Sequence, residues 1–390
     1  MARMIVRLGS ERLLASNLLD GRRVGVVANP ASIDGSFRHI VDRLASHPGA
    51  RLAAIFGPQH GFRADVQDNM IESPHGQDAA RRVPVYSLYS ETREPTAEML
   101  AGLDVLVIDL QDVGARIYTF IYTMANCLKA AARHGVPVIV CDRPNPVGGE
   151  AVEGPVLERG YESFVGLFPI PMRHGMTVGE LARLFNEEHG LGARLEVIPM
   201  EGWQRGMYWE ETGLPWVLPS PNMPTPDTAV VYPGAVLFEG TQLSEGRGTT
   251  RPFEILGAPW IDGETFAARL NAQGIEGAFF RPVVFEPTFH KHARQACGGV
   301  QIHVTDRRAF RPVLASVALL GAFHGADPAR FAWRQPPYEY EHRLMPIDIL
   351  AGSDALRPSI EASRPFRAIA ADWEEPTARF EGTRGQYLLY

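Results

Sequence analysis

Two glutamates and two arginines stand among glycines in one segment of the chain, where they could bind or react with a polar ligand. They are Glu239, Glu245, Arg247 and Arg251, and the glycines between them let the backbone approach a ligand closely. The preceding stretch, residues 214–227, contains five prolines, which hold the backbone extended and remove amide donors. This combination indicates a rigid loop that faces a polar or anionic ligand.

Three further polar segments each follow a short apolar run in the first part of the chain. They are residues 57–63, residues 109–116 and residues 142–146. The carboxyl ends of the strands in an open parallel sheet lie along one edge, and ligands bind there. If each apolar run is such a strand, the three segments should share one pocket.

The apolar runs and the segments between them predict an α/β fold with a Rossmann-like, doubly wound sheet. Strands are expected at residues 22–28, 51–56, 83–88, 104–109, 136–141 and 194–199. Helices are expected at residues 36–47, from Glu94-Pro95 onward, at 118–133 and at 177–189. Strands that are apolar on both faces and alternate with helices indicate a sheet covered on both sides.

A change of character near residue 250 predicts two domains. Residues 1–250 are expected to form the Rossmann-like α/β domain with long Pro/Gly-rich active-site loops, and residues 251–390 a smaller C-terminal α/β domain. In the second domain the pattern predicts helices at 263–272 and 308–324, strands at 280–285 and 299–304, and a helical tail at 346–371.

Composition and motifs argue against several classes of protein. The net charge of −7 disfavours a nucleic-acid partner, which would require a basic face. Residues 1–19 lack the apolar run of a signal peptide and no membrane span is evident, so a cytoplasmic location is expected. Cys127, Cys141 and Cys297 are widely spaced, as buried thiols are. Without GxGxxG or HExxH, no cofactor and no metal are expected.

Several long runs of the sequence resemble the DUF1343 family, and the resemblance as a whole extends over roughly residues 10–390. The runs are Gly57–Arg63, Gln67–Ser73, Asp109–Tyr118, Asp142–Asn145, His174–Thr177, Ser220–Pro226 and Phe238–Phe253. The characterised members are exo-β-N-acetylmuramidases, the NamZ-type glycoside hydrolases. The resemblance implies an active site in a cleft between two domains, with a small saccharide or muropeptide as partner. It also implies removal of terminal N-acetylmuramic acid from the non-reducing end of peptidoglycan fragments, as in cell wall recycling.

Glycoside hydrolysis of the usual kind needs two carboxyl groups that flank the scissile bond. Glu245 and Glu239 are the leading candidates, Asp109 stands in reserve, and His60 could carry a proton or orient the sugar. Each has a structural alternative. Glu245 could pair with a neighbouring arginine, Glu239 with a local partner at a helix end, Asp109 could cap a helix, and His60 could be bonded within its turn.

Binding of the sugar is expected to involve amides, arginines and an aromatic ring. Arg116 and Arg143 could hold the lactyl carboxylate of muramic acid by a bidentate fork, although a salt bridge between domains is the alternative for both. The expected substrate-binding residues are Gln59, Arg63, Arg116, Tyr118, Asp142, Arg143, Asn145, His174, Asn222 and Arg247.

Gln59 departs from the family pattern, because characterised muramidases carry glutamate within Gly-Pro-Glu-His-Gly. A glutamine amide cannot exchange a proton at neutral pH as a carboxyl group can. A non-catalytic member that binds a sugar or muropeptide is therefore the alternative function. A third hypothesis is a metal-dependent hydrolase that uses His60 with Asp65 and Asp68.

Overall fold

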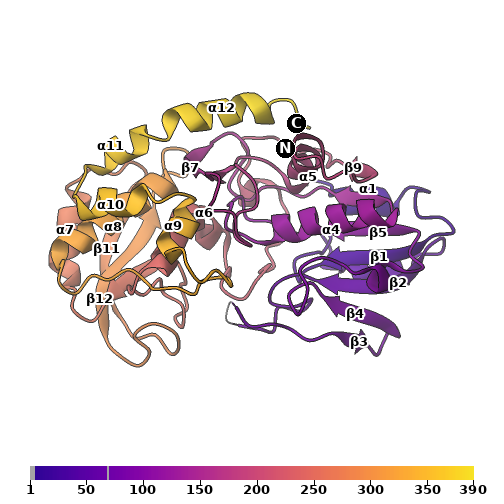
Figure 1. Cartoon of the computed structure of the whole chain (residues 1–390), viewed down its shortest axis with the longest axis horizontal. Helices are drawn as coiled ribbons and strands as arrows, with labels where there is room; N and C mark the ends of the chain where they lie inside the picture. Colours follow the sequence, from indigo (N-terminus) through magenta and orange to yellow (C-terminus); the bar gives the residue numbers. More distant parts are fainter. Residues whose placement is uncertain (1–4, 68–69) are drawn as a thin grey trace.

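A seven-stranded sheet forms the N-terminal lobe (Figure 1), in a computed structural model that describes residues 5–67 and 70–390. The strand order is β3 (Gly76–Asp78), β4 (Val83–Ser87), β2 (Arg51–Gly57), β1 (Arg23–Ala28), β5 (Val105–Asp109), β6 (Val138–Cys141) and β9 (Leu195–Ile198). The edge pair β3 and β4 is antiparallel, and the other neighbours are parallel. The six parallel strands thus follow the order of a doubly wound, Rossmann-like sheet. The strands and the fold class predicted from the sequence are confirmed.

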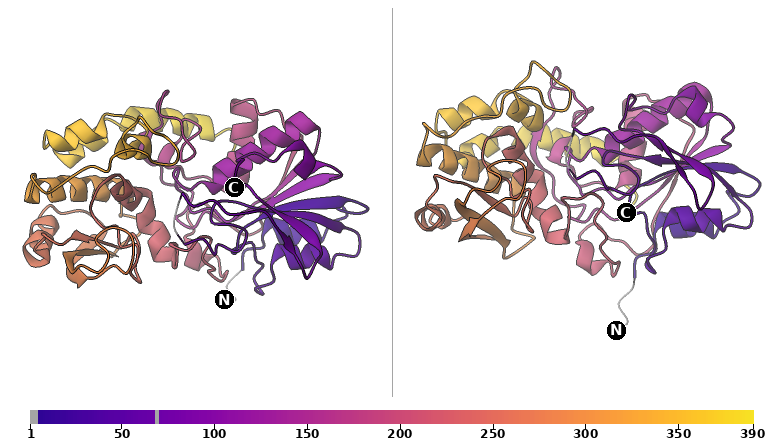
Figure 2. Two further views of the ribbon diagram at one scale, coloured as in Figure 1. Left: turned by 60° about the horizontal axis from the view of Figure 1, so that its bottom comes forward. Right: turned by 90° about the horizontal axis from the view of Figure 1, so that it is seen from below.

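Alternate residues of the central strands supply two separate hydrophobic cores, one on each face of the sheet. In β1, Val24 and Val26 belong to the core under α1 (Gly9–Leu14) and α2 (Ile40–Ala45). Val27 belongs to the core under α4 (Phe120–His134) and α5 (Val178–Glu188). The short α3 (Ala97–Leu100) packs on α4. Helices therefore lie on both sides of the sheet (Figure 2), as strands apolar on both faces require.

The Pro/Gly-rich middle of the chain contains more regular structure than its sequence predicts. It forms the antiparallel pair β7 (Glu153–Val156) and β8 (Pro171–Arg173), the 3₁₀ turns η1 (Trp209–Glu211) and η2 (Val236–Gly240), and α6 (Pro226–Ala235). Helix α6 has no polar stripe because it is buried almost all round, so it lacks the periodicity that reveals a surface helix. At Gly234 a side chain would collide with the backbone of Pro312, so glycine allows α6 to contact α8 closely.

The C-terminal lobe is a second, smaller α/β unit (Figure 2). Its antiparallel sheet has the order β10 (Ile255–Ala258), β12 (Cys297–Val304) and β11 (Ala278–Phe285). Helices α7 (Gly263–Asn271) and α8 (Pro312–Ala326) match the expected helices, although α8 begins at Pro312, a residue that favours the first turn. The tail is divided into α9 (Pro346–Ala351), α10 (Leu356–Glu361) and α11 (Phe366–Ala371), because the left-handed Gly352 ends α9.

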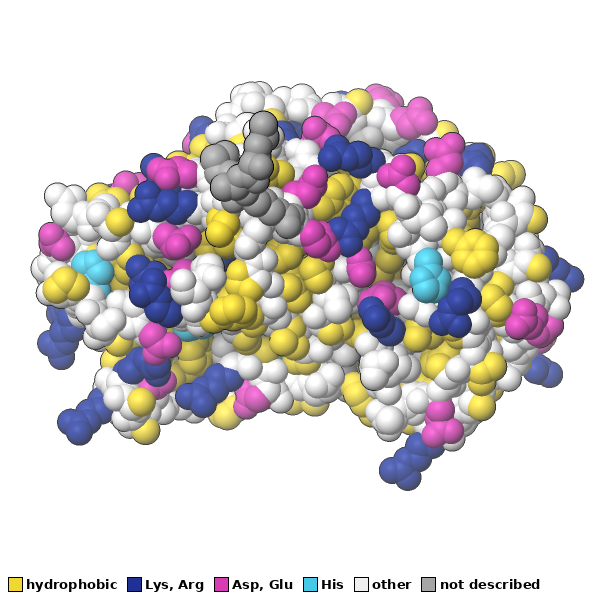
Figure 3. All heavy atoms as spheres, turned by 180° about the vertical axis from the view of Figure 1, so that it is seen from behind, with side chains coloured by type: hydrophobic (Ala, Val, Ile, Leu, Met, Phe, Trp, Pro, Cys, Tyr) yellow, Lys and Arg dark blue, Asp and Glu magenta, His cyan; other side chains and the backbone are white. Residues whose placement is uncertain are grey.

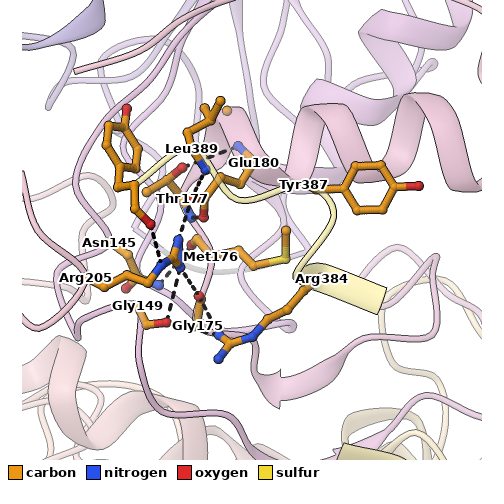
Figure 4. Close-up of polar contacts among 12 residues, drawn as sticks. Asn145, Gly149, Gly175, Met176, Thr177, Glu180, Arg205, Arg384, Tyr387 and Leu389 are labelled. Carbon is orange, nitrogen blue, oxygen red and sulfur yellow. Dashed lines mark hydrogen bonds and ion pairs between the residues drawn. The ribbon is translucent and has the colours of Figure 1, made fainter. Parts of the chain in front are cut away.

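The last helix, α12 (Glu374–Arg384), and the residues after it lead from the C-terminal lobe back to the N-terminal lobe (Figure 1). Polar contacts fasten this segment there (Figure 4). Arg384 donates to the carbonyls of Gly149, Glu150 and Gly175 at 3.0, 2.9 and 2.8 Å. The backbone amide of Leu389 donates to Glu180 at 2.8 Å. The chain end thereby joins the two lobes.

Replacing Arg384 with methionine should destabilise the fold by about 2 kcal/mol, because buried carbonyls lose a charged donor. Chemical denaturation gives the free energy of unfolding. Arg379→Met is the matched control, since Arg379 lies on the same helix and pairs only with the exposed Glu375. Equal stability of the Arg384 and Arg379 variants would contradict this view of the chain end.

The surface carries charges of both signs. On the face in Figure 3, acidic and basic side chains of the described residues are interspersed, with apolar side chains between them. No helix in the described part of the chain has the length and apolar character needed to span a lipid bilayer. The expected cytoplasmic location stays a prediction.

Candidate active site

A cavity lies where loops at the carboxyl edge of the sheet meet the C-terminal lobe. Its walls come from segments far apart in sequence: the loop after β2, the start of α4, the Pro-rich segment, and the C-terminal lobe. The lining residues are Gln59, His60, Ile117, Tyr118, Thr119, Phe120, Val165, Ser220, Asn222, Met223, Tyr232, Glu239, Arg247, Phe253, Tyr338 and Glu339.

Part of the expected constellation converges on this cavity. The predicted residues that line it are Gln59, His60, Tyr118, Asn222, Glu239 and Arg247. The segment 57–63 and the glutamate- and arginine-rich segment therefore meet, as expected. Residues 109–116 and 142–146 supply no lining side chain, so the expectation that all the sheet-edge segments share one pocket was too broad.

Glu239 is an ionised carboxylate held between a cation and a phenol. It lies in η2, which follows α6 directly, and its side chain is buried. Arg247 Nη2 donates to Oε1 at 2.6 Å, and the Tyr338 hydroxyl donates to Oε2 at 2.6 Å. Burial is the largest influence and opposes ionisation, as does the nearby Glu245, but the charge of Arg247 and the hydrogen bonds from Arg247 and Tyr338 together lower the pKa of Glu239.

Glu339 is a second carboxyl group in the cavity, and the hydrogen-bond donors to its side chain are uncharged. Its Oε2 accepts a hydrogen bond from the Tyr89 hydroxyl at 2.8 Å, and Gln59 Nε2 lies 3.4 Å from Oε1. Thr119 orients the Gln59 amide by donating to its Oε1 at 2.8 Å. Burial raises the pKa of Glu339. Sequence analysis missed this residue, and the rigid Pro-Pro-Tyr-Glu stretch before it was the available signal.

Aromatic rings form one wall of the cavity. Tyr118 meets Tyr232 edge to face with ring centroids 5.7 Å apart, and Tyr232 meets Phe253 at 4.8 Å. The Tyr118 hydroxyl donates to Ser220 Oγ at 2.8 Å. Rings beside hydroxyl and amide groups suit a sugar, which has apolar ring faces and polar edges. The lining therefore has the chemical character of a sugar site and includes two carboxyl groups.

Glu245, the leading carboxyl of the sequence analysis, does not line the cavity. It is fully buried, and Lys291 Nζ donates to its Oε2 at 2.7 Å. His290 Nδ1 and Arg247 Nε lie 3.3 and 3.5 Å from Oε1. These charges outweigh burial and hold the pKa of Glu245 well below its ordinary value. We therefore assign Glu245 the structural alternative, an ion pair that also steadies Arg247 behind Glu239.

Asp109 and Arg143 are bonded to each other. Arg143 Nε and Nη2 donate to the two carboxylate oxygens at 2.5 and 2.9 Å, and both side chains are buried. They lie at the crevice between β1 and β5, where such sheets commonly bind ligands. Beside them, Ser32 Oγ and Asn29 Nδ2 donate to the backbone carbonyls of residues 109 and 111. The proposed roles as reserve carboxyl and substrate clamp are accordingly not retained.

The other expected substrate residues also have partners within the protein. Arg116 is fully buried and donates to the carbonyls of residues 155, 170 and 350. Asp142 accepts from Thr177 Oγ1 and from the amide of residue 179 at the start of α5. Arg116 thus joins the lobes, and Asp142 caps a helix. Both side chains are buried and do not line the cavity, so neither is a substrate contact.

Three more expected contacts lie away from the cavity. Asn145 Nδ2 donates to the Met176 carbonyl at 3.0 Å, and His174 is fully buried 3.4 Å from Asp112. Arg63 is exposed, and its guanidinium lies 3.9 Å from Asp78. None of Asn145, His174 and Arg63 is among the lining residues.

Within residues 5–67 and 70–390, no group of three or more His, Cys, Asp or Glu side chains is arranged to hold a metal ion. The described residues therefore offer no support for the metal-dependent hypothesis. His60 Nδ1 is bonded to the carbonyl of Val66 at 2.9 Å. Asp68 lies outside the described residues.

The cavity lies between two α/β lobes and contains two buried carboxyl groups beside aromatic rings. These are the features of a glycoside hydrolase. Comparison with known proteins agrees with this class. Models for the N-terminal and C-terminal domains of the exo-β-N-acetylmuramidase NamZ match residues 24–227 and 230–390. The chain belongs to the NamZ family.

Individual relatives match over nearly the whole chain. The peptidoglycan β-N-acetylmuramidase NamZ of Bacillus subtilis (strain 168) is 45% identical over 387 residues, which cover 99% of this chain and 91% of that protein. A crystal structure of a DUF1343 family protein from Bacteroides fragilis NCTC 9343 is similar with a TM-score of 0.90 at 35% identity, over 100% of both chains. A second from that organism has a TM-score of 0.76 at 29% identity, over 99% of both chains.

Proposed function

We propose that this chain is an exo-acting glycosidase that removes terminal N-acetylmuramic acid from the non-reducing end of peptidoglycan fragments. The observation that carries the proposal is the buried Glu239 carboxylate in an aromatic-walled cavity, held by Arg247 and Tyr338. The relationship to the Bacillus subtilis enzyme supplies the sugar. Glu245, the carboxyl favoured by the sequence, does not line the cavity. This does not weaken the proposal, because two other carboxyl groups, Glu239 and Glu339, do line it.

The chemistry assigns Glu239 the task of stabilising positive charge. Cleavage of a glycosidic bond passes through an oxocarbenium-like transition state, in which the anomeric carbon becomes positively charged. A carboxylate whose pKa is lowered stays ionised across the neutral range, and its field is strong because the Glu239 side chain is buried. Arg247 and Tyr338 fix its orientation before the substrate arrives.

Polar side chains and one guanidinium group would bind the sugar. Gln59, Asn222 and His60 line the cavity and can meet hydroxyl or acetamido groups, while Tyr118 contributes its ring. Arg247 adds positive charge to the same wall and favours the lactyl carboxylate of muramic acid.

Release of free N-acetylmuramic acid from a muramyl–glucosaminyl disaccharide and from a chromogenic muramide tests the proposal. Wild-type protein should release the sugar from both and should act only on terminal residues. Calorimetry with the same sugars provides the second measurement. Binding without any release by folded protein would support the non-catalytic alternative that Gln59 suggested and would overturn the enzymatic proposal.

A further inference from the structure

Glu339 is the remaining carboxyl group that lines the cavity, beside Glu239, among the described residues. It comes from the C-terminal lobe, yet both of its hydrogen-bond partners, Tyr89 and Gln59, belong to the N-terminal lobe. Its side chain therefore reaches across the junction, and the residue is 5% exposed. The sugar that Glu239 faces would also contact this group.

The backbone that presents Glu339 is strained. Residues 338 and 341 exchange two hydrogen bonds of 2.9 Å, so Glu339 and Tyr340 form the two-residue turn between them. Both have positive φ, 45° and 67°, in a type of turn that favours Asn-Gly. Non-glycine residues rarely adopt this conformation, and such strain persists mainly at functional sites. The position of the Glu339 carboxyl is thus enforced despite an unfavourable local conformation.

An aromatic cluster holds this turn in place. The Arg93 guanidinium lies 4.0 Å from the ring centroid of Tyr89 and 4.9 Å from that of Tyr340. The Tyr89 and Tyr340 rings are 6.2 Å apart. Arg93 therefore braces the phenol that binds Glu339 and the residue that follows Glu339, while its charge stacks on rings instead of pairing with the carboxyl.

The two carboxyl groups of the cavity have opposite electrostatic environments. Glu239 is bonded to a guanidinium, whereas the hydrogen-bond donors to Glu339 are a phenol and an amide. Burial raises the pKa of Glu339, and the nearby negative charge of Glu239 adds to this rise. The hydrogen bonds from Tyr89 and Gln59 and the charge of Arg93 offset only part of it. Glycosidases need one carboxyl that stays charged and one that keeps its proton, and unequal surroundings create that difference.

We propose that Glu339 is the proton donor of the glycosidase reaction, an inference that rests on the proposed function. The Glu339 carboxyl gives its proton to the glycosidic oxygen while the bond from that oxygen to the anomeric carbon breaks, and the bond electrons stay on the leaving oxygen. Water then supplies the hydroxyl group on the anomeric carbon and the proton that restores Glu339. One water is consumed for each bond cleaved.

Gln59 becomes a positioning residue in this scheme. Its amide spans from Thr119 Oγ1 to the Glu339 carboxyl, so the neutral side chain orients the acid and needs no proton of its own. The acid function therefore comes from the C-terminal lobe, and it is assembled only when the lobes meet.

Glu339→Gln, tested on two muramides with different leaving groups, decides the proposal. On the disaccharide, whose sugar leaving group needs a proton, kcat should fall about 10²-fold or more. On an aryl muramide, whose phenolate leaves unassisted, the loss of kcat should be several-fold at most. The alkaline limb of the pH profile of kcat/KM on the disaccharide should disappear, because that limb reports deprotonation of the acid.

Two further variants separate catalysis from folding. Glu341→Gln changes a carboxyl in the same hairpin that pairs with Arg343 and does not line the cavity, and it should keep wild-type kinetics. Tyr89→Phe removes a donor that lowers the pKa of Glu339, so it should move the alkaline limb to higher pH. A structural role for Tyr89 alone would leave that limb where it is.

The outcomes distinguish this inference from the proposed function. Equal losses on the disaccharide and the aryl muramide, near-wild-type rates in Glu339→Gln, or an unchanged alkaline limb would each overturn the role of Glu339 and leave the glycosidase intact. Wild-type protein that hydrolyses neither muramide would overturn both.

Discussion

Replacing Glu239 with glutamine is expected to lower kcat on every muramide by about 10³-fold or more, toward the upper end of what one catalytic group contributes. The amide has nearly the same shape and can still meet Tyr338 and Arg247, but it carries no negative charge to stabilise the anomeric carbon. The lost negative charge stabilises the anomeric carbon whatever the leaving group is. The fall in kcat should therefore be similar for substrates with good and with poor leaving groups. This pattern differs from that expected for Glu339→Gln.

Steady-state kinetics on the disaccharide and the aryl muramide measures this effect, with circular dichroism to establish folding. Glu254→Gln is the matched control, since Glu254 is another buried glutamate of the same segment that binds Thr228 and Arg251 outside the cavity. It should retain kcat within a few-fold. An active Glu239→Gln enzyme would remove the central assignment of the proposed function.

Replacing Glu245 with glutamine should destabilise the protein by about 3–5 kcal/mol, the usual cost of removing one partner from a buried ion pair. Lys291 would be left buried without its countercharge, and Arg247 would lose one of its two carboxylates. The catalytic role that the sequence favoured for Glu245 predicts a different result, in which this variant keeps its fold and loses all turnover. Thermal and chemical unfolding, with kinetics on the folded fraction, distinguishes the two.

The pH dependence provides a second measure of Glu245. Its folded pKa lies below the ordinary value of 4.5, so the stabilisation is fully present above pH 4.5 and is lost as pH falls toward the folded pKa. The stability difference between wild type and Glu245→Gln should therefore shrink in acid. The double variant Glu245→Gln/Lys291→Met should recover part of the loss, because no unpaired charge remains. A difference that does not change with pH would contradict the ion pair.

The regular part of the fold could be predicted from the sequence because its signal is local. Strands such as residues 105–109 are apolar on both faces, and amphipathic helices such as 120–134 carry a clear periodicity. Helix α6 escaped prediction for the opposite reason, since a helix surrounded by protein has no polar side. The antiparallel pair β7 and β8 was also missed, as each strand is only a few residues long.

The sequence predicted which kinds of side chain line the site. It did not predict which individual glutamates reach the cavity. Glu239, Arg247, Gln59 and His60 were found because charged and amide groups among glycines after buried strands commonly face ligands. The same reasoning selected Glu245 equally well, since Glu239 and Glu245 differ only in which neighbours surround them in space.

The sequence by itself determined the doubly wound sheet, the family and the kind of chemistry, because these depend on local periodicity and on long runs of residues. Only the tertiary structure decided which carboxyls reach the cavity. Lys291 and His290 reach Glu245 across some 45 residues of chain, and Tyr89 reaches Glu339 across 250. Burial and partner charges set what a carboxyl can do, and both are properties of side chains that meet only after the two lobes have packed together.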